Sequence, residues 1–465
     1  DDKYYMVASE FHYMGIQMLE SHDMVNWQII SQVYDRLDGY DEVNRYGRGS
    51  WAPALVFHGG RYYVYFCTPD EGLFMTSAAN PHGPWEPLCL VKGVKGWEDP
   101  CPFWDKDGQA YLGHSKVGAG PIIIHKMSAD GRQLLDEGVT VYTGPVAEGT
   151  KIRRRGEHYY LVIPEGGVGT GWQTVLRSRS IFGPFEKKVI LEQGTTSVNG
   201  PHQGNIVDTP DGQWWLFHFQ DTPDLGRVVH LQPVSWTDGW PMAGADIDMN
   251  GIGEPVYVWK KPSIGDTQKA SLPQHDDEFD GEAVTWKGQY QNALGLQWQW
   301  NHNPVNDHWS LSERKGWLTL RALDADQLKN AHNTLTQKTM GYEGEAVTQL
   351  DAASLSEGTR AGLCAIGSKY VGVGVTRQGG KLLFYTEVNG TTAFLATAPS
   401  TVYVKAKVAG SAFQFYYSTD RKTWREAGEK VVIRPANWKG PRLGLYCYGS
   451  SGKAHFNYFH YQILK

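Results

Sequence analysis

The chain has 465 residues, which is more than one hydrophobic core accommodates and predicts two or three domains. A formal net charge of −6 and scattered basic residues exclude a broad basic surface of the kind that binds nucleic acid. The sequence contains no apolar run near the ~20 residues that span a bilayer and no signal peptide. Aromatic residues make up 13% of the chain, and flat rings of this kind also stack against sugars.

A repeated pair of mostly aromatic residues marks the first half of the chain. Each pair follows a polar or glycine turn and begins an apolar strand; the five copies are Tyr4-Tyr5, Tyr62-Tyr63, Ala110-Tyr111, Tyr159-Tyr160 and Trp214-Trp215. Their second residues lie 58, 48, 49 and 55 positions apart, close to the period of a four-stranded propeller blade. We therefore predict a five-bladed β-propeller over residues 1–262, with its chemistry at the central axis.

A second domain follows the propeller. The repeat ends after Trp240, and residues 263–275 are predicted to be a linker with few large apolar side chains. From 276 to 465 the sequence alternates strands, such as 371–375, 381–388 and 403–408, with turns rich in glycine, asparagine and aspartate. Strands of this length without amphipathic helices between them predict a β-sandwich.

Three ionisable residues occupy the same phase of consecutive repeats. Asp99 precedes the third predicted blade, Glu148 the fourth and His202 the fifth, so we expect all three at one end of the axis. Two carboxylates in an aromatic-rich cavity are the minimum equipment for breaking a glycosidic bond. Turn acids are common, however, and a hydrogen-bonded turn histidine remains the simpler explanation of His202. Arg227, inside the fifth blade, needs a carboxylate or a polar ligand to offset its burial.

The chain as a whole resembles glycoside hydrolase family 43, in particular its β-xylosidase and α-L-arabinofuranosidase group. The resemblance implies an all-β protein, a five-bladed β-propeller followed by a concanavalin-like β-sandwich. It rests on short motifs spread over both domains: Phe11-His12-Tyr13, Trp51-Ala52-Pro53, Asp99-Pro100, Glu148-Gly149, His202-Gln203-Gly204, Gly226-Arg227, Trp298-Gln299-Trp300 and Asn333-Thr334-Leu335.

The resemblance also implies roles for the matching residues. Glu148 would be the general acid, and Asp99 would hold it in place and favour its protonated form by like-charge proximity. Phe11 and Trp51 would wall in a pentose ring, and Arg227 would bind a sugar hydroxyl or carboxylate.

Metal ions enter only as structural candidates, because the chemistry itself requires no cofactor. The resemblance implies that His202 helps to hold an ion or an ordered water on the axis. The acidic run from Asp276 to Asp280 resembles the start of a calcium-binding strand, with Asp277 as the candidate ligand. Its expected C-terminal partner strand carries His455-Phe456-Asn457 where an aspartate is common.

The sequence departs from the family at the general base. Relatives carry this aspartate in an Asp-Pro-Asp or Asp-Pro-Ser turn just before the position of Asp1, so we expect that an N-terminal segment is missing here. The alternative is a protein that binds sugars without hydrolysing them. Glu10 could replace the base, but strand alternation should point it away from the side of the pocket that Phe11 lines.

We predict an exo-acting, inverting glycosidase that releases a terminal pentose from hemicellulose side chains or oligosaccharides. β-D-Xylosidase and α-L-arabinofuranosidase activities are hard to separate, and Val168, where close β-xylosidases usually have threonine, slightly favours the second. An endo-arabinanase is a further alternative. The expected partner is an arabinose- or xylose-containing saccharide, the expected location secreted or periplasmic, and the oligomeric state is not predicted.

Overall fold

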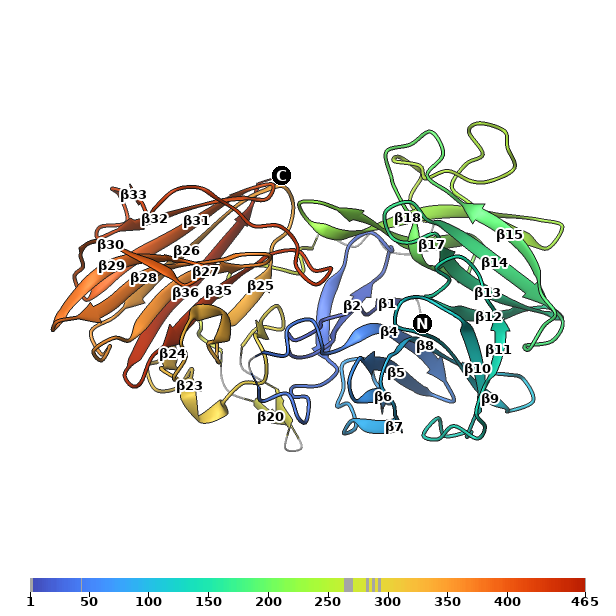
Figure 1. The fold of residues 1–465 in the computed structure, drawn as a ribbon, viewed down its shortest axis with the longest axis horizontal. Coiled ribbons are helices and arrows are strands. Elements are labelled where there is room, and N and C mark those ends of the chain that lie inside the picture. The colour runs from blue at the N-terminus through green and yellow to red at the C-terminus, as the bar shows by residue number, and fades with distance from the viewer. Residues whose placement is uncertain are drawn as a thin grey trace.

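The computed structural model describes residues 3–42, 44–262, 271–281, 284–286, 289–291 and 294–464. Figure 1 shows two β-rich bodies side by side, a propeller drawn in blue to green and a sandwich drawn in orange to red. Residues 263–270 of the predicted linker lie outside the described residues. Among those that are described, the helical elements are two short 3-10 turns, Asn306–His308 and Leu328–Asn330, and no helix is long and apolar enough to cross a membrane.

Five antiparallel sheets form the propeller, each from strands that are consecutive in the chain. The first sheet has three strands, β1 (Tyr4–Met6), β2 (Gln17–Ser21) and β3 (Gln28–Gln32), and the others have four each. The second and third sheets consist of β4 (Trp51–His58), β5 (Arg61–Thr68), β6 (Gly72–Ala78), β7 (Cys89–Gly93), β8 (Trp97–Trp104), β9 (Ala110–Lys116), β10 (Ile122–Met127) and β11 (Val139–Tyr142). The fourth and fifth consist of β12 (Lys151–Arg155), β13 (His158–Glu165), β14 (Trp172–Ser178), β15 (Glu186–Leu191), β16 (His202–Asp208), β17 (Trp214–Thr222), β18 (Gly226–Thr237) and β19 (Trp240–Ala243).

The predicted blade number is confirmed, but the repeated pair marks the second strand of each four-stranded blade rather than the first. Successive side chains of a strand point to opposite faces, and here both faces pack on neighbouring blades. Tyr159 lies in one apolar cluster with Tyr111 of the third blade, whereas Tyr160 lies in another with Leu216 of the fifth. Each blade therefore begins earlier than the pair suggests, and Asp99 lies within β8 instead of before the blade.

The second domain is the predicted β-sandwich. Its seven-stranded sheet has the order β22 (Gln299–Trp300), β25 (Leu335–Lys338), β35 (Arg442–Tyr448), β27 (Arg360–Ile366), β28 (Tyr370–Gln378), β29 (Lys381–Val388), β30 (Thr391–Thr397). The eight-stranded sheet contains β23 (Trp309–Ser310), β24 (Leu318–Arg321), β36 (Lys453–Ile463), β26 (Glu343–Asp351), β31 (Thr401–Ala409), β32 (Ala412–Ser418), β33 (Arg425–Glu426) and β34 (Val431–Val432). A separate hairpin pairs β20 (Val284–Trp286) with β21 (Gln289–Gln291). Side chains such as Val373 and Phe456 fill the space between the two large sheets.

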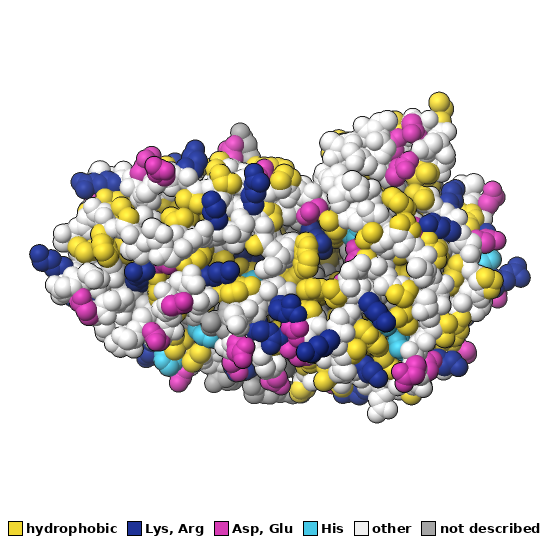
Figure 2. Space-filling view, in the orientation of Figure 1, with side chains coloured by type: hydrophobic (Ala, Val, Ile, Leu, Met, Phe, Trp, Pro, Cys, Tyr) yellow, Lys and Arg dark blue, Asp and Glu magenta, His cyan; other side chains and the backbone are white. Residues whose placement is uncertain are grey.

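The two domains share one apolar core. Met14 and Ile16, from the loop that leads into β2, belong to the same buried cluster as Trp300 and Leu335 of the sandwich. Backbone hydrogen bonds also cross the boundary, including Met14 N to Trp300 O at 3.0 Å. Figure 2 shows basic and acidic side chains interspersed over both domains on this face, and a hollow in the surface where the domains meet. The loop before β2 is therefore held by the sandwich as well as by the propeller.

Candidate active site

Three carboxyl groups meet at one end of the propeller; we call Glu98, Asp99 and Glu148 the acid cluster. Asp99 and Glu98 lie in β8, and Glu148 lies on the loop before β12. Carboxylate oxygens of the three residues lie within 4.8 Å of one another. The sequence predicted that Asp99 and Glu148 share a cavity, and the structure brings them together, but Glu98 was not predicted.

A β-bulge explains why neighbouring residues of one strand point the same way. The register between β8 and β9 shifts between Glu98 and Cys101, and Asp99 has a left-handed φ of 55°. A bulge of this kind re-aims side chains that would otherwise alternate between the two faces. The same device recurs at the start of β4, where Ala52 has φ 35°, and of β16, where Gln203 has φ 54°. In each of these blades the bulge therefore re-aims side chains at the start of the first strand, where the candidate site residues lie.

Buried hydrogen bonds hold the acid cluster. Asp99 Oδ2 accepts a hydrogen bond from the Gly149 amide at 2.7 Å and another from Gln203 Nε2 at 3.1 Å. Burial raises the pKa of Asp99, and the neighbouring Glu148 carboxylate raises it further. Burial, and then the charges of Asp99 and Glu148, raise the pKa of Glu98 to about 8. The acid cluster is thus built to retain a proton at neutral pH.

His202 joins the acid cluster through one ring nitrogen. Its Nε2 lies 2.5 Å from Glu148 Oε1, and the side chain is fully buried. Its Nδ1 has no hydrogen-bond partner among the described residues, so an ordered water or an ion on the axis would fit there. A cation bound by the three carboxylates would need their ionised forms, whereas burial favours protonated Glu98 and Asp99. The acid cluster fits proton chemistry better than metal binding.

Aromatic rings from both domains line the site; we call Phe11, Trp51 and Trp438 the aromatic wall. The Phe11 ring lies 6.2 Å from the Trp51 ring and 5.6 Å from the Trp438 ring, and the two tryptophan rings lie 5.2 Å apart. The sequence predicted Phe11 and Trp51, but it gave no reason to choose Trp438, which the sandwich contributes. Trp438 lies in the hairpin turn closed by Ala436 and Lys439, at a φ of 61°. A bulky residue in this conformation is strained, which favours a functional role.

The remaining predicted pocket residue connects the aromatic wall to the acid cluster. The Arg227 guanidinium lies over the rings of Phe219 at 4.6 Å and Trp438 at 5.5 Å. It also interacts electrostatically with Glu148 and Asp99, while its buried Nε has no hydrogen-bond partner in the described part of the chain. The guanidinium therefore has donor capacity left for a ligand.

The backbone holds Phe11 firmly. The amide of Phe11 donates to Ser50 O at 3.0 Å, and the amide of Ser50 donates to Phe11 O at 3.1 Å. Gly49 makes this approach possible, because a Cβ atom at position 49 would come within 1.7 Å of Phe11 O. The position of the first ring of the aromatic wall thus depends on a glycine in the neighbouring segment.

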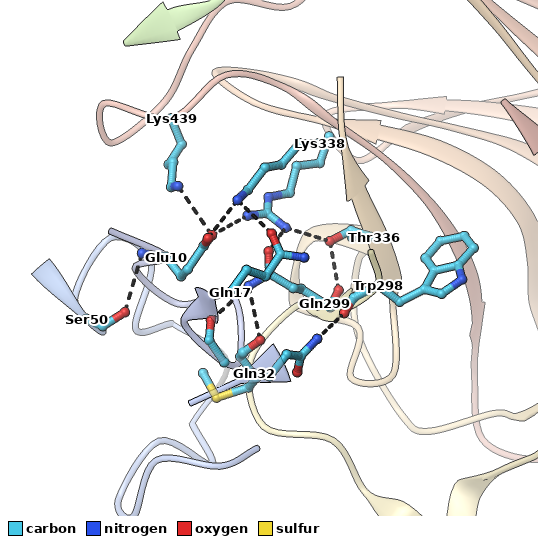
Figure 3. Close-up of polar contacts among 12 residues, drawn as sticks. Glu10, Gln17, Gln32, Ser50, Trp298, Gln299, Thr336, Lys338 and Lys439 are labelled. Carbon is cyan, nitrogen blue, oxygen red and sulfur yellow. Dashed lines mark hydrogen bonds and ion pairs between the residues drawn. The ribbon is translucent and has the colours of Figure 1, made fainter. Parts of the chain in front are cut away.

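The two other acids considered in the sequence have structural contacts. Asp277, the candidate calcium ligand, accepts hydrogen bonds from the Phe279 amide at 2.8 Å and the Trp298 indole at 2.7 Å, so its two oxygens already have protein donors. These contacts do not fit a calcium ligand well, and calcium binding stays a prediction. Glu10, the candidate substitute for the base, points toward Lys338 of the sandwich, which donates a hydrogen bond to its carboxylate (Figure 3).

Comparison with known proteins assigns both halves of the chain. The family model described as Glycosyl hydrolases family 43 matches residues 1–241, and the model described as Beta xylosidase C-terminal Concanavalin A-like domain matches residues 290–462. A Xylanibacter ruminicola protein, named provisionally as a β-xylosidase, is 54% identical over 449 residues, which cover 95% of this chain and 83% of the relative. A β-xylosidase of Formosa agariphila is 34% identical, with coverages of 97% and 85%.

Further relatives carry a second activity in their names. The non-reducing end α-L-arabinofuranosidase BoGH43B of Bacteroides ovatus is 29% identical, with coverages of 69% of this chain and 61% of the relative. A solved structure of a bifunctional GH43-CE protein of Bacteroides eggerthii is 30% identical with a TM-score of 0.86, and the match covers 100% of this chain and 62% of that protein. The GH43 protein BlXynB of Bacillus licheniformis is 25% identical with a TM-score of 0.85 and coverages of 99% and 96%.

Proposed function

Since this chain belongs to glycosyl hydrolases family 43, as the sequence resemblance predicted, we propose that it is an exo-acting, inverting β-D-xylosidase. Its substrates would be oligosaccharides derived from hemicellulose, from which it would release a terminal D-xylose. The observation that carries this proposal is the acid cluster, with Glu148 hydrogen-bonded to His202 beside the buried Asp99. The names of the two relatives that match most of the chain support xylose as the sugar.

In the reaction, Glu148 donates its proton to the glycosidic oxygen as the bond from C1 to that oxygen breaks. A water molecule attacks C1 from the opposite face and gives a proton to a carboxylate base, so the products are a free pentose of inverted configuration and a shortened saccharide. An inverting pair needs carboxylates ~6.5–9.5 Å apart to leave room for that water. Glu98 and Asp99 lie within 4.8 Å of Glu148, too close for the base.

This distance supports a positioning role for Asp99. Its Oδ2 binds the amide of Gly149, the residue after Glu148, and so fixes the backbone that carries the acid. Asp99 would thus position the proton donor and not act as the base.

The aromatic wall supports removal of single terminal sugars. Trp438 reaches the propeller from the sandwich and packs against Phe11 and Trp51 of the first two blades. A wall built from two domains narrows the approach for a long chain, which favours exo action over an endo-arabinanase. Arg227, with donor capacity left over, would bind a hydroxyl of the terminal sugar.

α-L-Arabinofuranosidase activity is the second candidate. The name of the Bacteroides ovatus relative and the valine at position 168 support it, and the two pentoses present similar hydroxyl patterns to one pocket. We also propose a secreted or periplasmic location, because polymeric hemicellulose does not cross a membrane. Fractionation of the native host would test this location.

The function is tested by hydrolysis of p-nitrophenyl β-D-xyloside and p-nitrophenyl α-L-arabinofuranoside by the full-length protein that contains the general base. We expect faster release from the xyloside, xylose alone from xylo-oligosaccharides, and the α-anomer as first product in a proton NMR time course. Faster release from the arabinofuranoside would favour the second candidate. No hydrolysis of either by folded protein would refute both activities and favour a sugar-binding protein, and mixed oligosaccharides from a long polymer would indicate endo action.

A further inference from the structure

A group of charges around a buried carboxylate lies between the two domains; we call Glu10, Lys338, Lys439 and Arg442 the interdomain charge cluster. Glu10 comes from the propeller, on the loop between β1 and β2, and all three cations come from the sandwich. Lys338 Nζ donates to Glu10 Oε1 at 2.6 Å, Arg442 to Oε2 at 2.9 Å and Lys439 Nζ to Oε2 at 3.3 Å. Figure 3 shows Lys338 and Lys439 converging on the Glu10 carboxylate.

One carboxylate compensates three cations. Glu10 and Arg442 are each 1% exposed, so neither charge is well solvated by water. Although burial opposes ionisation, the charges of Lys338, Lys439 and Arg442 lower the pKa of Glu10 to about 2. Burial and the neighbouring cations lower the pKa of Lys439 to about 7 in spite of Glu10. Loss of the carboxylate would leave the buried Arg442, and beside it the partly buried Lys338 and Lys439, without their counter-ion, which is strongly unfavourable for the buried charge.

Further contacts hold the sandwich side chains of the interdomain charge cluster against the propeller. The Arg442 guanidinium lies over the Tyr13 ring at 3.7 Å and donates to Gln299 Oε1 at 2.9 Å. Gln299 Nε2 in turn donates to the backbone oxygen of Gly15 at 2.8 Å. Lys338 Nζ also donates to Gln17 Oε1 at 2.8 Å. Glu10 therefore has one well-defined position relative to the sandwich.

The cluster is joined to the aromatic wall through the backbone on both sides. Glu10 immediately precedes Phe11, and Lys439 immediately follows Trp438. Phe11 has a φ of 52° and Trp438 a φ of 61°, both in the left-handed region that bulky residues avoid. In these conformations the charges of Glu10 and Lys439 meet each other while the rings of Phe11 and Trp438 meet 5.6 Å apart. In each of the two segments, therefore, one residue forms the ion pair and its neighbour in the sequence contributes a ring to the aromatic wall.

We propose that Glu10 is a positioning residue for substrate binding: by pairing with Lys439 across the domain boundary, it holds Trp438 against Phe11 and so shapes the aromatic wall. This inference rests on the proposed function only for the identity of the substrate, a xylose-containing saccharide. Glu10 itself touches no substrate, since its carboxylate is enclosed by the cations of the sandwich. The sandwich thus contributes to sugar binding through a charge pair that lies outside the pocket.

A double-mutant cycle between Glu10→Gln and Trp438→Ala tests the proposal. We expect Glu10→Gln to raise KM for the p-nitrophenyl glycoside about tenfold and to change kcat less than about twofold, because ground-state and transition-state binding are lost together. In the Trp438→Ala background, Glu10→Gln should change KM less than about twofold, because its effect passes through that ring. Glu313→Gln, which removes a surface carboxylate paired with Arg321 and Lys453, is the matched control and should leave both constants unchanged.

Hydrogen exchange gives a readout that does not depend on catalysis. We expect faster exchange of the amides of residues 436–440 in Glu10→Gln, with β13 and β14 unchanged. If Glu10→Gln does not fold, Lys439→Met replaces it, because that variant removes only the cation next to Trp438. A KM increase of the same size with and without Trp438, or unchanged exchange in the hairpin, would overturn the proposal. If the wild type hydrolyses neither glycoside, the proposed function fails, while hydrogen exchange still decides the positioning role.

Discussion

Replacing Glu98 by glutamine removes the carboxyl group of the acid cluster whose pKa is raised to about 8. The pKa of this carboxyl rises from 4.5 to about 8 on folding. Between these values the folded chain holds a proton that the unfolded chain has released, so the contribution of Glu98 to wild-type stability is fully present below pH 4.5 and is lost as the pH rises toward about 8. Integrated from about pH 5.5 to about pH 8, this difference lowers the free energy of unfolding by about 3 kcal/mol.

Glu98→Gln keeps the size of the side chain but cannot ionise, so it should escape this loss. In urea unfolding followed by tryptophan fluorescence, we expect the variant to gain about 3 kcal/mol relative to wild type between about pH 5.5 and about pH 8. Glu137→Gln, at an exposed position of the propeller, is the control and should show no such trend. A stability difference that stays constant over this interval would refute the protonated state of Glu98.

Other changes probe the remaining parts of the site. Glu148→Gln should lower kcat about 10²–10⁴-fold on xylobiose and less on the p-nitrophenyl xyloside, whose leaving group needs little protonation; equal losses on both would contradict a general acid. Gln203→Ala removes a hydrogen bond to Asp99 and should lower kcat about tenfold, and unchanged kinetics would show that this contact does not position Asp99. Gly49→Ala forces Phe11 away, so it should lower the free energy of unfolding by about 1–3 kcal/mol and raise KM. Gly169→Ala is its control, because no atom lies within 4 Å of its added Cβ. Equal melting temperatures of the two variants would contradict the clash.

The repeat in the sequence was sufficient to predict the blades and to bring Asp99, Glu148 and His202 together. Their shared phase reflects a real symmetry, because consecutive blades present equivalent positions to one axis. Glu98 could not be predicted in the same way, since strand alternation directs it to the face opposite Asp99 and only the bulge reverses this. A proline inside a predicted strand, as at Pro53 after Ala52 and Pro100 after Asp99, is the sequence signal that could have indicated such bulges, since Ala52 and Asp99 both have a left-handed φ.

Trp438 could not be predicted from local sequence patterns, for a different reason. It lies more than 380 residues from Trp51 in the sequence, and only the packing of two domains brings the rings within 5.2 Å. The aromatic excess of the composition indicated a sugar site without indicating which rings form it. Strand alternation could not orient Glu10, because Glu10 lies on a loop; its three partners all come from the second domain, and no periodicity connects them.

The common apolar core of the loop before β2 and the sandwich bears on how this protein can be recombined. Met14 and Ile16 are buried against Trp300 and Leu335, so the first blade of the ring is completed by side chains of the other domain. A gene fragment that encodes the propeller alone would expose this surface, and we expect it to aggregate. Chimaeras between relatives should therefore exchange the two domains as a pair, and selection on either domain will constrain the sequence of the other.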